Sequence, residues 1–221
     1  MHVRGNFAYL LSALLGFLFL IAIFAQYPGI GGNQVVSFAL ELTLIVGIWS
    51  LARQRFWFVF GLILIAIGAV NIILDAIVHH SWAPYVNLIV ALLFYLFTTG
   101  LAFRSLFTGK RVDMNMIMGS ICVYILVGIS WSILYFFAAV IHPDAFEGVH
   151  SITTKQLFTD LLYYSFVTLS TLGYGDITPM IPITRTLAYI EALFGQFYIA
   201  ILVASFVGMH ISRSHKQKDK T

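Results

Sequence analysis

The sequence is short of charge and of cysteine. Charged residues make up 10% of the 221 positions, while 60% are hydrophobic; soluble domains carry about 25% charged residues. A soluble core of this size would not hide so much apolar surface, so we expect lipid to surround much of the chain. Cys122 is the one cysteine, which excludes an internal disulfide and any zinc-finger spacing. The scattered net charge of +3 gives no basic patch for nucleic acid.

Long apolar runs dominate what is present. Because a bilayer core of about 30 Å needs about 20 helical residues, six runs qualify as spans: Phe7–Ala25, Val35–Leu51, Phe56–Val78, Trp82–Leu106, Met116–Ile141 and Thr184–Ile211. The shorter amphipathic stretch Thr154–Ser170 suits a re-entrant helix instead. We therefore predict an all-α membrane protein with six transmembrane helices and one re-entrant pore helix. Its parts are a four-helix membrane domain (1–112), a pore module (113–211) and a short cytoplasmic tail (212–221).

The basic residues predict the orientation of these spans. Lys155 and Arg185 fall on one side, and the other ten share the side of the two termini: Arg4, Arg53, Arg55, Arg104, Lys110, Arg111, Arg213, Lys216, Lys218 and Lys220. The excess predicts that both termini are cytoplasmic. Phe7–Ala25 also has features of a secretory signal, but its apolar stretch exceeds the roughly 7–15 residues of a signal core. We favour an uncleaved span.

The segment Thr171–Asp176, with the sequence Thr-Leu-Gly-Tyr-Gly-Asp, carries the chemistry. A potassium ion leaves water only where oxygens replace its hydration shell, and backbone carbonyls do so when successive residues aim them at one axis. That geometry alternates left- and right-handed backbone conformations, which Gly173 and Gly175 permit. We predict a selectivity filter in which the outer Asp176 concentrates cations and potassium binds the carbonyls of Thr171, Leu172, Gly173 and Tyr174. The side chains of Leu172 and Tyr174 are expected to pack behind it.

This part of the sequence resembles the potassium channel family, from about Met116 to His210. Thr171–Asp176 matches the family's filter signature Thr-X-Gly-Tyr-Gly-Asp, with Leu172 where valine or isoleucine is commoner. Pro179 and Arg185 match the short link that leads into the inner helix. The resemblance implies a homotetrameric, fourfold pore with Met116–Ile141 as outer helix and Thr184–Ile211 as inner helix. It also implies the inner membrane of a bacterium, with no cofactor other than permeant potassium and no regulatory domain.

Three further roles follow from the resemblance alone. Tyr163 and Tyr164 match the aromatic pair that braces the filter from the pore helix, and Gly195 falls at the inner-helix hinge. Val167 is a departure, because some family members place there a glutamate that couples to the filter aspartate. Any slow closure of the filter must therefore depend on other contacts.

Glu191 lies inside the inner helix, one turn before Gly195. An ionisable residue at membrane depth is a functional candidate. The alternative is a structural role, in which the carboxyl is protonated or bonded to a pore-helix hydroxyl such as Ser165 or Thr168. We favour the structural role.

The inner helix also carries an apolar stripe, Ile199, Val203 and Val207. Four copies would narrow the cytoplasmic mouth, and hydrophobic constrictions gate by dewetting. Ordinary helix packing explains the same spacing equally well. Asp144 and Glu147 fit solvated loop positions better than ion-attracting ones.

The four leading helices lack the arginines of a voltage sensor. Arg104 is the one basic residue of the fourth span, near its inner end, and Glu41 and Asp75 fit local partners or a crevice. The four helices could be a degenerate voltage sensor, a lipid or ligand sensor, or an assembly scaffold.

We predict a potassium-selective channel and no enzyme, since no nucleophile–base pair, metal motif or phosphate loop is present. A potassium transporter is the second hypothesis, but such proteins usually carry four imperfect pore loops in one long chain. A non-conducting regulatory subunit is the third, and a flux assay separates it from a channel.

Overall fold

The computed structural model describes residues 7–26, 55–78, 83–108, 114–149 and 153–218. The predicted second span Val35–Leu51, Glu41 and the side chain of Asp75 lie outside these described parts. The six described helices are α1 (Phe7–Gln26), α3 (Arg55–Val78), α4 (Ala83–Thr108), α5 (Met114–Ile141), α6 (Thr154–Leu169) and α7 (Pro182–Lys218). Each coincides with a predicted apolar run or, for α6, with the predicted pore helix.

Three of these helices are long and apolar enough to span a membrane. Within the described residues they are Tyr85–Arg104, Met114–Ile141 and Pro182–Gly208, and shorter apolar stretches occupy Phe7–Ile23 and Gly61–Asn71. Helix α7 does not stop at Ile211 but continues to Lys218, because no glycine or proline follows to end it. The helix thus takes in most of the stretch predicted as a tail.

A small extended element was not predicted. After α5, the 3₁₀ turn η1 (Pro143–Ala145) leads into β1 (Phe146–Glu147), which pairs antiparallel with β2 (Thr178–Pro179) just after the filter segment. Phe146 lies opposite Pro179 and Glu147 opposite Thr178. Two-residue strands have no readable alternation, so the sequence pattern gave no sign of them.

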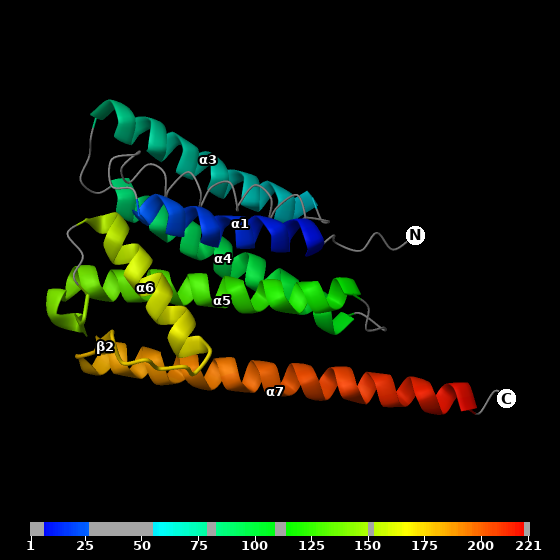
Figure 1. The fold of residues 1–221 in the computed structure, drawn as a ribbon. Helices are drawn as coiled ribbons and strands as arrows, with labels where there is room; N and C mark the ends of the chain where they lie inside the picture. Colours follow the sequence, from blue (N-terminus) through cyan, green and yellow to red (C-terminus); the bar gives the residue numbers. More distant parts are fainter. Residues whose placement is uncertain (1–6, 27–54, 79–82, 109–113, 150–152, 219–221) are drawn as a thin grey trace.

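Helix α5 is the central element of the fold (Figure 1). Helices α1 and α4 pack along it, α3 packs outside α4, and α6 crosses obliquely from α5 to α7. The short pore helix is therefore held between the outer and inner helices. This arrangement places the segment after α6 beside the outer part of α7.

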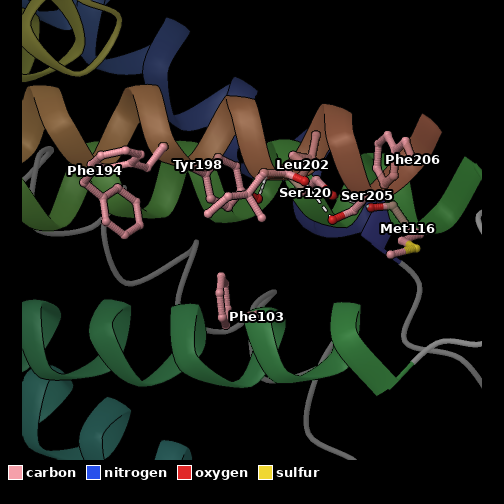
Figure 2. A pocket seen from close by; sticks show the side chains of 10 residues that line it. Phe103, Met116, Ser120, Phe194, Tyr198, Leu202, Ser205 and Phe206 are labelled. Atoms are coloured by element: carbon pink, nitrogen blue, oxygen red, sulfur yellow. Dashed lines mark hydrogen bonds between the residues drawn. The ribbon is translucent and has the colours of Figure 1, made fainter. Parts of the chain in front are cut away.

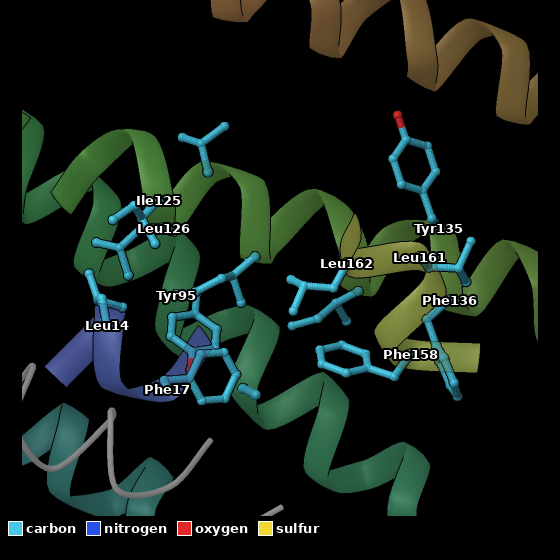
Figure 3. Packing of buried hydrophobic residues seen from close by; sticks show 14 of the residues in the cluster. Leu14, Phe17, Tyr95, Ile125, Leu126, Tyr135, Phe136, Phe158, Leu161 and Leu162 are labelled. Atoms are coloured by element: carbon cyan, nitrogen blue, oxygen red, sulfur yellow. The ribbon is translucent and has the colours of Figure 1, made fainter. Parts of the chain in front are cut away.

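The buried core joins the leading helices to the pore part (Figure 3). Phe17 of α1, Tyr95 of α4, Leu126 of α5 and Phe158 of α6 belong to one buried cluster. All four side chains are no more than 2% exposed. Helix α1 is thus packed against the pore part through buried side chains.

Candidate ion-conduction site

The pore helix α6 has a defined cap at each end. At its start the hydroxyl of Thr153 accepts a hydrogen bond from the Gln156 backbone N–H at 3.3 Å, as N-cap threonines do. At its end the N–H of Leu172 donates to the Val167 carbonyl, and the N–H of Thr171 donates to the Thr168 carbonyl, both at 2.9 Å. This pair of bonds is a Schellman C-cap. The filter segment therefore begins inside the cap of the pore helix.

The backbone of the filter alternates in handedness. Thr171, Gly173 and Gly175 have φ values of 60°, 57° and 79°, whereas Leu172 and Tyr174 between them do not have positive φ. The positive φ expected for both glycines is present. Left-handed conformation costs a threonine about 1–2 kcal/mol, and the Schellman bonds offset that cost at Thr171. Positive φ at Thr171 was not predicted, although its position directly after a helix end is a signal for such a cap.

The filter segment faces away from its own chain. All residues from Thr171 to Asp176 are exposed, with Leu172 and Tyr174 at 59% and 68%. Neither side chain packs behind the filter segment within the described part of the chain, so their supporting role stays a prediction. Among the described residues, no group of three His, Cys, Asp or Glu side chains is placed to hold a metal ion. The oxygens of this segment are its backbone carbonyls, the Thr171 hydroxyl and the Asp176 carboxylate.

The two adjacent tyrosines of the pore helix face different surroundings. Tyr164 is buried and packs edge-on against Tyr135 and Phe146, with ring centroids 5.0 and 5.3 Å away. Tyr163 is 41% exposed, and its hydrogen bond to the Asp176 carboxylate raises the pKa of the Tyr163 hydroxyl. One tyrosine thus anchors α6 in the core and the other touches the filter exit. Val167, at the predicted position behind the filter, is buried.

The last carbonyl of the pore helix lies against both long helices. The Tyr124 hydroxyl of α5 donates to the Leu169 carbonyl at 3.1 Å. From α7, Gly195 approaches the same carbonyl so closely that any Cβ would collide with it. Helix α7 runs through Gly195 unbroken, so its predicted hinge role stays a prediction. The structure gives this glycine a packing reason of its own.

Glu191 lies where all three pore-part helices meet. Its Oε1 is 2.5 Å from the Ser165 hydroxyl of α6, and its Oε2 is 2.6 Å from the Tyr135 hydroxyl of α5. Ser165 also lies 2.8 Å from the Gly128 carbonyl of α5. Ser165 is one of the two partners expected from the sequence, and Tyr135 was not expected. A tyrosine 56 positions away leaves no local pattern to read.

The filter exit is attached to the loop that follows α5. The Ala145 carbonyl accepts hydrogen bonds from the Met180 N–H at 2.9 Å and from the Thr184 hydroxyl at 3.1 Å. Gly148, with φ 85°, lies directly against the Asp176 carbonyl, where a Cβ would collide with backbone. The loop between α5 and α6 thus contacts the backbone that follows the filter segment.

The half of α7 that follows Gly195 is lightly covered. Ile199, Val203 and Val207 are 49%, 53% and 52% exposed, so the predicted stripe is free of its own chain. Figure 2 shows an apolar pocket on the other side, lined by α7 residues and by Phe103 of α4. There the Tyr198 hydroxyl donates to the Ser120 carbonyl at 2.8 Å and ties α7 to α5.

Comparison with known proteins agrees with this geometry. Residues 129–211 match the model of a family described as ion channels. The chain is 34% identical over 85 residues to two-pore potassium channel 5 of Arabidopsis thaliana, covering 38% of this chain and 18% of that protein. It is 36% identical over 69 residues to two-pore potassium channel 4 of the same plant, covering 31% and 23%.

A third relative matches a shorter stretch. The inward rectifier potassium channel Kirbac3.1 of Paramagnetospirillum magnetotacticum is 38% identical over 56 residues, covering 25% of this chain and 19% of that protein. The matches thus span only about a fifth of the relatives' lengths. No solved structure matches significantly. The apolar helices and these matches indicate an integral membrane protein, and its residues 129–211 are similar to ion channels, with potassium channels among the relatives that match the chain.

Proposed function

We propose that the protein conducts potassium ions selectively and passively across a membrane. The observation that carries the proposal is the alternating backbone of the filter, with positive φ at Thr171, Gly173 and Gly175. That alternation lets successive carbonyls replace the hydration shell of a potassium ion. The carbonyls of Thr171, Leu172, Gly173 and Tyr174 supply the oxygens, and Asp176 attracts cations at the outer mouth.

The conducting unit in this proposal is a homotetramer. Each chain contributes one filter segment, and non-helical backbone at membrane depth must line a cavity or be buried in protein. Six spans per chain, with both termini in the cytoplasm of a bacterium, complete the proposed topology. Gly195 serves as hinge, and Ile199, Val203 and Val207 narrow the inner mouth.

A flux assay on the purified, reconstituted protein tests the proposal. We expect potassium flux to exceed sodium flux strongly in the wild-type protein. In Gly173→Ala, a Cβ enters a left-handed position at a cost of about 1–2 kcal/mol in each chain, so flux or selectivity should collapse. Gly100→Ala is the matched control, because an added Cβ there meets nothing within 4 Å. Selective flux through Gly173→Ala would place the filter elsewhere, and absence of flux in the wild type would refute conduction.

A further inference from the structure

Glu191 is a buried acid bonded to two other helices. It is 0% exposed, and its two carboxyl oxygens contact the hydroxyls of Ser165 in α6 and Tyr135 in α5. In Figure 3 the Tyr135 hydroxyl points away from the hydrophobic cluster and toward α7. The side chain therefore connects the outer, pore and inner helices at one point.

The number of available hydrogens limits the charge state of this cluster. Three short contacts join Tyr135, Glu191, Ser165 and the Gly128 carbonyl. Each hydroxyl supplies one hydrogen, and the carbonyl supplies none. An ionised carboxylate adds none either, so Ser165 would have to leave either Glu191 or Gly128 without a hydrogen bond. A protonated Glu191 donates to Ser165, which then donates to Gly128, and all three contacts are satisfied.

Within the described part of the chain, the groups bonded to Glu191 carry no positive charge. Both hydrogen-bond partners are neutral hydroxyls, and Glu191 also acts electrostatically on the phenols of Tyr124 and Tyr164. An unpaired buried carboxylate costs far more than a buried, hydrogen-bonded neutral group. The neutral acid avoids that cost and keeps the bridge complete.

We propose that Glu191 is a positioning residue for the selectivity filter and acts in its protonated form, as a three-way hydrogen-bonded bridge that fixes the pore helix between α5 and α7. The link to the filter is direct, because Ser165 belongs to the helix whose C-cap contains Thr171. A shift of α6 therefore moves the first filter carbonyls. This role rests on the proposed function, whereas the protonation state does not.

Infrared spectroscopy tests the protonation state without any need for conduction. In membranes at neutral pH, the wild-type protein should show the carbonyl band of a protonated carboxylic acid, and the band should be lost in Glu191→Gln. A wild-type-minus-variant spectrum with a carboxylate band in its place would overturn the proposal. A protein with the acid band but no potassium flux would refute the proposed function alone.

Selectivity tests the positioning role. The amide of Glu191→Gln donates to Ser165 and accepts from Tyr135, so its potassium-over-sodium permeability ratio should stay within about threefold of wild type. Glu191→Met fills a similar volume but makes no hydrogen bonds, and the ratio should fall about tenfold or more. Equal damage in both variants would show that a charged carboxylate is required. Wild-type selectivity in Glu191→Met would show that the bridge does not position the filter.

A serine pair covers the case in which Glu191→Met does not assemble. Ser165→Ala removes the middle of the bridge, so its permeability ratio should fall about threefold or more. Ser130→Ala is the matched control, since that buried hydroxyl donates to Leu126 within its own helix at 2.8 Å. Equal ratios in the two alanine variants would overturn the positioning role.

Discussion

Individual residues in the pore part are selected by backbone contacts as much as by side-chain chemistry. Gly195 shows this most clearly, because its Cα approaches the Leu169 carbonyl, which also accepts the Tyr124 hydroxyl at 3.1 Å. A larger residue would collide with the backbone carbonyl of Leu169, which moves less readily than a flexible side chain. The requirement for glycine follows from contact between two helices in the observed conformation, with or without a hinge motion.

Gly195→Ala should therefore displace the end of α6 and with it the filter segment that follows. The added Cβ forces α6 and α7 apart, at a cost of about 1–3 kcal/mol per chain typical of overpacking. We expect a lower thermal midpoint in detergent and a reduced potassium-over-sodium flux ratio. Gly208→Ala in the same helix is the control, because its Cβ meets nothing within 4 Å and alanine favours helix. Indistinguishable behaviour of the two variants would contradict the close approach.

The conformation or partner of a single residue was predictable where neighbouring residues in the sequence determine it, and not where tertiary contacts do. Gly173 and Gly175 were predicted to have positive φ because only glycine adopts it freely, and both do. Thr171 was not, since its φ of 60° results from two hydrogen bonds of the helix cap. The Tyr135 partner of Glu191 was also missed, because tertiary packing alone brings it there.

At the scale of elements, the long apolar runs predicted the described helices within a few residues, except for the inner end of α7. The length of an apolar run is a strong signal because the thickness of the bilayer core determines how many residues a spanning helix needs. The β1–β2 pairing was missed, and it is the element that attaches the loop between α5 and α6 to the filter exit. Its stability comes from a few backbone hydrogen bonds, which leave no trace in composition.

Gly148→Ala should break this attachment. Its φ of 85° is strained for alanine, and the added Cβ would collide with the Asp176 carbonyl. We expect the outer end of the filter to shift, with a lower single-channel potassium conductance in planar bilayers. Glu147→Ala is the control, because it alters an exposed side chain and leaves the backbone pairing with Thr178 in place. Unchanged conductance in Gly148→Ala would show that the attachment does not shape the filter.

Helix α4 should not act as a voltage sensor. Steep opening requires about 3–4 charges per subunit, each worth about 2.3 kcal/mol per 100 mV. The span Tyr85–Arg104 has Arg104 as its one basic residue, at its inner end. Conductance in symmetrical potassium should thus vary only shallowly from strongly negative to strongly positive potentials. A steep sigmoid opening curve, abolished by Arg104→Gln, would refute this expectation.

At the scale of the whole molecule, helix α7 and the filter segment are poorly covered by the rest of the chain. In the outer helix α5, 67% of the apolar span is buried within the chain, whereas in α7 the share is 17%. Lipid is able to cover apolar side chains such as Leu193 and Phe197, which are 50% and 63% exposed. It cannot satisfy the exposed polar backbone from Thr171 to Asp176. The two observations together favour copies of the chain packed around the filter.

Four copies are expected, because the alternating filter needs carbonyls from four sides to enclose an ion. Native mass measurement and chemical cross-linking of the purified protein should both give a tetramer. Gly173→Ala should also be tetrameric, since its Cβ meets no atom of its own chain within 4 Å and the strain is confined to the filter. Assembly and selectivity would then be separable, with the variant tetrameric but unselective. A stable monomer or dimer that still conducts potassium would show that the ion path does not need four chains. Lipid would then have to cover most of the exposed face of α7.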